Sequence, residues 1–138
     1  MRFINQLMAL VLLLGFAFAE SSAQESSADS EQAVMAWLAL VDAGKVDESL
    51  EATSRYFRQR VDAENWQQSM RLNRKPMGPL IRRELMSSAV AGNLPGGPNG
   101  EYMTFKFTTD YANKKQAVES ITMLLEGEQW RVIGYYVQ

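Results

Sequence analysis

The spacing of apolar residues changes once along this chain, at the segment 76–79, and this change limits the fold to one class. Before the segment, apolar side chains recur every three or four residues, which is the period of a helix with one buried face. After it they alternate with polar side chains, which is the period of a strand with one buried face. Proline lacks the backbone N–H and restricts the residue before it, so the segment ends the helical part. The sequence therefore predicts an α+β fold, with the helices first and the sheet second.

Three helices are predicted in the first part. The first covers about residues 30–43 and ends at Gly44, a residue suited to the left-handed conformation that closes helices. The second covers about residues 47–60. Asp62 is the expected N-cap of the third, which ends before Pro76.

Four strands are predicted in the second part. They cover residues 80–90, 103–108, about 120–125 and 130–137, with a Pro- and Gly-rich loop at 93–100. Short turns between strands favour an antiparallel meander. The expected fold is three N-terminal helices packed on a curved, cone-like four-stranded antiparallel sheet.

The first 19 residues have the parts of a secretory signal peptide. Arg2 lies near the start, an apolar run covers Leu7–Phe18, and Ala17-Phe18-Ala19 precedes Glu20. The run of 12 residues is shorter than the ~20 residues that span a bilayer, so no transmembrane anchor is expected in the mature protein. We therefore expect export to the periplasm and cleavage near residue 19, with Ser21-Ser22-Ala23 as a second candidate cleavage point before Gln24.

The remaining 119 residues suffice for one domain. Residues 20–30 are rich in Ser, Ala, Gln and Glu without an apolar period, so a flexible leader is expected there, followed by a single α+β domain over 31–138. The chain contains no cysteine, so no disulfide can form and apolar burial must stabilise the domain.

The composition also excludes several kinds of chemistry. Histidine is absent as well as cysteine, which removes the commonest general base and the commonest metal ligand. Structural zinc sites, cysteine nucleophiles and histidine-assisted serine triads all lack their parts. The acidic residues do not follow the spacing of a calcium loop. No catalytic residue, metal site or cofactor is therefore expected.

Charge is unevenly distributed along the chain. Residues 20–54 contain eight acidic residues and one lysine, whereas residues 55–83 contain eight basic residues and two acidic ones. Such a basic segment either packs beside the acidic one or forms a face for anionic lipid headgroups, and packing is the expected outcome. An overall pI near 5.2 argues against a nucleic-acid partner.

Four motifs, in order, resemble one family of exported bacterial proteins, catalogued as domain of unknown function 4019. The motifs are Ala36–Gly44, Arg74–Gly78, Leu94–Tyr102 and Trp130–Tyr136. The resemblance covers about residues 31–138 and implies no catalytic residue, because the family has no established activity. The order of helices and strands also looks like the nuclear transport factor 2-like, or cystatin-like, fold, an analogy that by itself implies no function.

Four residues are candidates for ligand binding: Arg83, Tyr102, Tyr111 and Glu119. Arg83 and Glu119 lie in predicted strands, where alternate side chains point inward. A buried Arg–Glu pair either holds a ligand carboxylate or satisfies itself, and self-pairing is expected because buried charges need partners. The tyrosine hydroxyls could line the mouth of a cone, although aromatic residues on strands usually pack in the core.

These observations favour a small exported module that binds a ligand or an envelope protein without catalysis, and that could form a homodimer through its sheet. The alternative is a cone-fold enzyme, similar to an isomerase or dehydratase, acting on a small carbonyl or hydroxyl compound. Glu119 or Asp110 would then serve as the base and a tyrosine as the proton donor.

Overall fold

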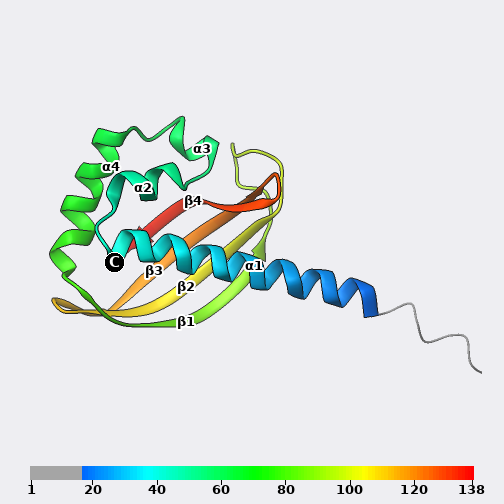
Figure 1. The fold of residues 1–138 in the computed structure, drawn as a ribbon, viewed down its shortest axis with the longest axis horizontal. Coiled ribbons are helices and arrows are strands. Elements are labelled where there is room, and N and C mark those ends of the chain that lie inside the picture. Colours follow the sequence, from blue (N-terminus) through cyan, green and yellow to red (C-terminus); the bar gives the residue numbers. More distant parts are fainter. Residues whose placement is uncertain (1–16) are drawn as a thin grey trace, which may run out of the picture.

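The computed structural model describes residues 17–138 and shows one long helix lying across an open sheet (Figure 1). Helix α1 (Ala17–Asp42) crosses one face of the sheet, and its N-terminal part extends past the sheet. All but the last three residues of the expected signal peptide lie outside the described residues. Within the described part of the chain, no helix is long and apolar enough to cross a membrane.

The first helix starts earlier than predicted. Residues 20–30, expected to form a flexible leader, are helical and continuous with the rest of α1. No glycine or proline interrupts residues 17–42, so nothing in the segment ends the helix. Ser30 is buried, and its hydroxyl donates to the carbonyl of Ser27 at 2.8 Å, a bond made within the helix.

The single helix predicted over 47–60 is two short helices, α2 (Val46–Glu51) and α3 (Arg55–Arg58). They are separated because Thr53 forms a parallel bridge with Val132 of the last strand. The next amide, of Ser54, donates to the carbonyl of Val132 at 2.8 Å. The Ser54 hydroxyl then caps α3 by accepting from the amide of Phe57. A contact distant in sequence therefore divides the helix.

The third predicted helix begins as expected. Asp62 caps α4 (Ala63–Ser69) by accepting from the amide of Asn65 at 2.8 Å. The chain continues as a π-helical turn, η1 (Met70–Arg74), and a 3-10 turn, η2 (Lys75–Met77). Residues 17–138 thus contain four α-helices rather than the three predicted, and only α1 and α4 have seven residues or more.

The sheet is an antiparallel meander, as predicted, with the strands in chain order. Its strands are β1 (Leu80–Ala91), β2 (Tyr102–Tyr111), β3 (Lys114–Glu126) and β4 (Gln129–Val137). The sheet is open, with β1 and β4 at its two edges, and the expected cone-like shape is not confirmed.

The main core lies between α1 and the sheet. Val34, Trp37 and Leu38 from α1 pack against Phe105, Phe107 and Ile121 from the central strands, all nearly or fully buried. A smaller cluster forms around Tyr102, Leu124 and Ile133, with Tyr56 of α3 and Leu94 of the 92–101 loop packed against it.

Candidate functional site

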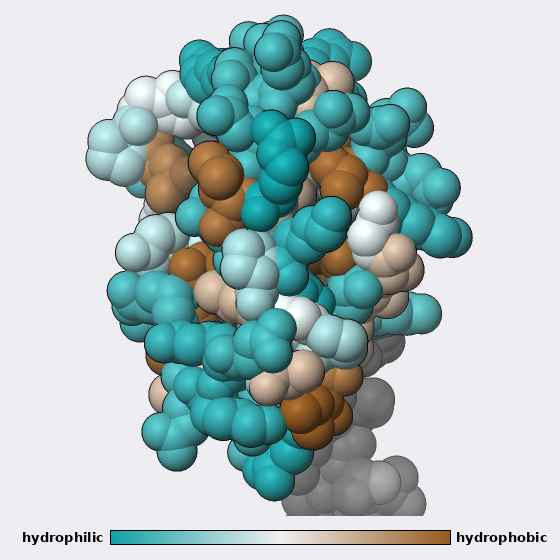
Figure 2. Space-filling model, turned by 90° about the vertical axis from the view of Figure 1, so that its left-hand side faces the viewer, coloured by the Kyte–Doolittle hydropathy of each residue, from teal (hydrophilic) through white to brown (hydrophobic). Residues whose placement is uncertain are grey.

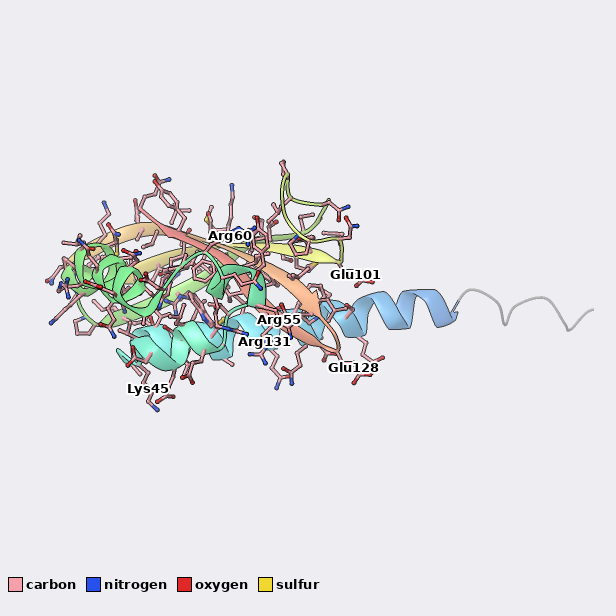
Figure 3. All side chains as sticks on the ribbon, turned by 90° about the horizontal axis from the view of Figure 1, so that it is seen from above. Lys45, Arg55, Arg60, Glu101, Glu128 and Arg131 are labelled. Atoms are coloured by element: carbon pink, nitrogen blue, oxygen red, sulfur yellow. The ribbon has the colours of Figure 1, made fainter. Side chains whose placement is uncertain are left out.

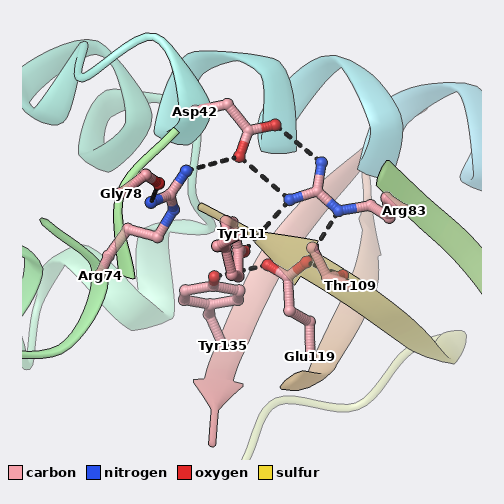
Figure 4. Close-up of polar contacts among 8 residues, drawn as sticks. All are labelled: Asp42, Arg74, Gly78, Arg83, Thr109, Tyr111, Glu119 and Tyr135. Carbon is pink, nitrogen blue, oxygen red and sulfur yellow. Dashed lines mark hydrogen bonds and ion pairs between the residues drawn. The ribbon is translucent and has the colours of Figure 1, made fainter. Parts of the chain in front are cut away.

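A buried cluster of charged and hydroxyl groups joins the end of α1 to the sheet (Figure 4). We call it the ionic cluster. Its members are Asp42, Arg74, Arg83, Thr109, Tyr111, Glu119 and Tyr135. They come from α1, η1 and all four strands, so the cluster forms only when the whole domain is folded.

Arg83 of β1 is the centre of this cluster. Its Nε donates to Glu119 Oε1 at 2.7 Å, and its Nη1 and Nη2 donate to the two carboxylate oxygens of Asp42 at 2.7 and 3.0 Å. The contact with Asp42 is a bidentate pair, the strong and directional form of an arginine–carboxylate contact. Arg83 thereby connects the edge strand to β3 and to the C-terminal end of α1.

Glu119 of β3 is fully buried, and both of its oxygens are engaged. Oε1 also accepts a hydrogen bond from the Thr109 hydroxyl at 2.6 Å, and Oε2 accepts one from the Tyr135 hydroxyl at 2.6 Å. Three donors therefore surround one carboxylate, as a buried charge requires.

Arg74 closes the cluster on the side of η1. One of its Nη atoms pairs with Asp42 at 3.2 Å, and the other donates to the carbonyl of Gly78 at 2.8 Å. Its guanidinium lies 4.2 Å from the centre of the Tyr111 ring, a cation–π contact, while its buried Nε has no hydrogen-bond partner. Two guanidinium groups face two carboxylates, so the cluster carries no net charge.

The environment of the cluster favours the protonated forms of its arginine and tyrosines. Burial lowers the pKa of Arg83, but the hydrogen bonds to Asp42 and Glu119 outweigh it, and the net pKa is raised. Burial, and then the charge of Glu119, raise the pKa of Tyr111 to about 12. The same two causes raise the pKa of Tyr135 further. Neither tyrosine is set up to lose a proton near neutral pH.

This arrangement suits a structural tie better than acid–base chemistry. A catalytic base must have a free oxygen within reach of substrate. Glu119 lies within 2.6 Å of a tyrosine hydroxyl, but both of its oxygens are occupied and the side chain is fully buried. A hollow of about 310 Å³ lies elsewhere, between α1 and the β3–β4 turn, and its lining includes Glu25, Asp29 and Trp130.

Three of the four candidate residues come together. Arg83, Tyr111 and Glu119 belong to the ionic cluster, with the Arg83–Glu119 contact formed as expected. Tyr102 lies in the smaller hydrophobic cluster, and its hydroxyl donates to the carbonyl of Pro98 at 2.5 Å. Asp110, considered as an alternative base, accepts from the backbone amide of Gln116.

The sequence did not point to Asp42, Arg74 or Thr109. Asp42 follows the last apolar turn of α1, where an acidic residue is ordinarily exposed, and Arg74 lies in a basic segment. Only the packing of α1 and η1 on the sheet brings them together. Tyr135 was not among the four candidates either.

A second feature of the molecule is the exposed edge strand β1. Ten of its twelve residues are exposed, and only Arg83 and Ala91 are partly buried. The described part of the chain has eight exposed large hydrophobic residues, and five of them lie in β1: Leu80, Ile81, Leu85, Met86 and Val90. The exposed fractions reach 82% at Val90. Large exposed apolar patches are common at interaction surfaces.

The basic residues of segment 55–83 do not form one exposed face. The side chains of Arg74 and Arg83 are buried in the ionic cluster, and Arg82 pairs with Glu84 at 2.7 Å. On α3, Arg58 donates to the carbonyls of Glu51 and Thr53. Arg60 lies over the Tyr56 ring, and Figure 3 shows Arg60 and Arg55 around α3, at a distance from β1 in the chain.

The end of the molecule formed by α4, η1 and the β2–β3 turn is mostly hydrophilic. Figure 2 shows this end, where hydrophobic residues appear as separate groups among hydrophilic ones. Leu72 of η1, 63% exposed, has the charged residues Arg71 and Arg74 close by in sequence. This end therefore offers no apolar run comparable with that of β1.

These features define a small α+β domain with a closed polar cluster and a highly exposed edge strand, β1. A family model described as a protein of unknown function, DUF4019, matches residues 33–135, and the chain belongs to this family, as the four motifs indicated. No curated protein matches the chain, and no solved structure does. The likeness to the nuclear transport factor 2-like fold is therefore not confirmed and stays a prediction.

Proposed function

We propose that this protein is an exported, non-catalytic binding module that acts through the edge of β1. The observation that carries the proposal is the contrast between its two features. The ionic cluster is buried, charge-balanced and internally bonded, whereas β1 presents backbone groups and five large apolar side chains without cover. Exposed strand edges accept an added strand from a partner, with main-chain hydrogen bonds supplying affinity.

The expected signal peptide supports a place in the periplasm. If the proposal holds, the protein recovered from a periplasmic fraction starts near Glu20, as measured by the mass of the intact chain. Full-length protein that stays in the cytoplasm would contradict export.

The binding surface can be tested in cells with a photo-reactive amino acid placed at Met86 of β1, which is 58% exposed. Tyr136 of β4 is the matched control, because it is 60% exposed and lies on the opposite edge of the same sheet. We expect cross-linked products from position 86 that are absent from position 136. Substituting Leu85→Asp should abolish them, because a charge on the apolar edge opposes strand addition. Equal products from both edges, or none from β1, would contradict the proposal.

The enzyme alternative is less well supported by the geometry. It requires a carboxylate beside a tyrosine within a space that a substrate can enter, but Glu119 and Tyr135 are bonded to each other inside the core. We therefore do not assign a reaction to this cluster.

A further inference from the structure

We infer that the β1 edge pairs with the β1 edge of a second copy of this chain, joining two four-stranded sheets into one. The inference rests on the proposed function, because it names one partner for the surface proposed there. The pairing is antiparallel about a two-fold axis that passes through Arg83.

The first argument is the free backbone edge. The strand order is β1-β2-β3-β4, so β1 exchanges hydrogen bonds with β2 on one side, and no strand of the described residues lies on its other side. A row of N–H and C=O groups along twelve residues is a template for a further strand. When two copies pair antiparallel, the β1 edge of each copy is satisfied by the other. Such two-fold pairing through β1 stops at two chains.

The second argument is the order of side chains along β1. Residues 80–86 read Leu-Ile-Arg-Arg-Glu-Leu-Met: two apolar residues, two basic and one acidic, and two apolar residues. Antiparallel pairing about Arg83 places Arg82 opposite Glu84 of the second copy, and Glu84 opposite its Arg82. The segments Leu80–Ile81 and Leu85–Met86 then lie opposite each other, so apolar residues face apolar residues and Arg82 faces Glu84.

The third argument is exposure. Ile81 and Met86 are 60% and 58% exposed, and Leu80 and Leu85 are 37% and 40% exposed. The pairing covers all four from each chain. Arg82 and Glu84 are equally accessible, with 65% of each side chain exposed.

The residue on the axis does not oppose the pairing. The Arg83 side chain turns inward and is neutralised by Asp42 and Glu119, so two arginines meet at the axis through their backbones only. The register irregularities of β1 lie between Leu80 and Arg82 and between Leu85 and Ser87. Between them, Arg82–Leu85 forms a regular ladder, and the charged pairs fall within it.

The dimer is tested by a charge reversal with rescue. The protein, purified as the cell produces it, should have twice the mass of one chain by light scattering after size-exclusion chromatography. Arg82→Glu places two glutamates opposite each other at two symmetric positions, and Glu84→Arg does the same with arginines. Because each cross-strand pair is worth up to about 1 kcal/mol, each variant should weaken the dimer about tenfold or more. The double variant Arg82→Glu/Glu84→Arg restores opposite charges and should restore the dimer. Thermal unfolding of each variant shows whether the domain remains folded.

The register is tested by mixed disulfides, since the chain has no cysteine of its own. Residues directly opposite in an antiparallel pair lie about 4.5–5.5 Å apart between Cα atoms, within the range that a disulfide bridges. An Arg82→Cys chain mixed with a Glu84→Cys chain should form a cross-linked dimer on oxidation. Either chain alone should form much less. Equal cross-linking in all three samples would overturn the register.

Failure of the dimer and failure of the proposed function give different results. A purified protein that stays monomeric at concentrations on the order of 100 µM overturns this inference. If position 86 still gives cross-linked products in cells, at masses other than twice the chain, the proposed function stands. If β1 gives no product in cells and the purified protein is monomeric, both are contradicted.

Discussion

Among the charged residues of the described chain, Glu119 is the most deeply buried. Its carboxylate is fully buried and accepts three hydrogen bonds, one of them from the guanidinium of Arg83. Removing one member of such a pair leaves an uncompensated buried charge, which costs more than the intact pair contributes.

Replacing Glu119 by Gln should therefore lower the free energy of unfolding by about 3–5 kcal/mol, measured by urea denaturation. The matched control is Glu101→Gln, which neutralises an exposed carboxylate outside both the ionic cluster and the β1 edge and should leave the urea midpoint unchanged. Equal effects from the two substitutions would show that the buried carboxylate contributes no more to stability than an exposed one.

Tyr111 makes the free energy of unfolding depend on pH in the alkaline range. Its pKa is about 12 in the folded protein, whereas an unfolded tyrosine titrates near pH ~10. Between these values the folded state holds a proton that the unfolded state loses, so the stabilisation is present below pH ~10 and is lost as pH rises toward about 12.

We expect the free energy of unfolding to fall across this window, and to fall less steeply in Tyr111→Phe. Urea unfolding followed by tryptophan fluorescence at several alkaline pH values measures both slopes. An identical slope in the two proteins would contradict the assignment.

The candidate residues were predictable where the alternation of side chains along a strand alone decides which of them point into the core. Arg83 and Glu119 could be paired because each lies on a strand whose inward positions are set by its apolar residues. Tyr102 lies on the other face of β2. Met103, Phe105 and Phe107 belong to the main core, and alternate side chains of a strand point to opposite faces, so Tyr102 joins the smaller hydrophobic cluster instead.

At the level of elements, the local sequence determines where helices are capped, whereas contacts distant in sequence determine where a predicted helix is divided. Asp62 at the start of α4 was predicted from its position alone, because its side chain satisfies an amide that the helix leaves free. The division between α2 and α3 was not predictable locally, since it depends on Thr53 pairing with Val132.

The cap of α4 gives a direct test at this scale. Asp62→Ala should lower the free energy of unfolding by about 1 kcal/mol, because the amide of Asn65 loses its acceptor. Asp62→Asn keeps an acceptor oxygen and should lower it much less. If both variants lose the same amount in thermal denaturation, the side-chain cap does not contribute.

Helix α1 and strand β1 differed from the sequence expectations for related reasons. The sequence gives no stop signal between residues 17 and 42, and helix formation continued where low hydrophobicity had suggested a leader. In β1, the apolar residues were expected to be covered on one face, but the helices pack mainly over the other strands, with contacts from α1 to β3 and β4.

At the scale of the whole molecule, the order of helices and strands was recoverable because the apolar period changes once. Family membership followed from the four motifs. What the sequence could not supply was the distribution of exposure, because it depends on which strand ends the sheet. The ionic cluster is buried and the β1 edge is exposed, and the proposed function depends on this contrast.

Partner binding along the β1 edge can be measured by peptide-resolved amide hydrogen exchange, comparing the protein in an envelope extract with the same protein isolated and diluted. We expect added protection in the extract confined to residues 80–91, the strand with a free edge. Protection centred on residues 114–126, the strand that carries Glu119, or no added protection anywhere, would contradict this expectation.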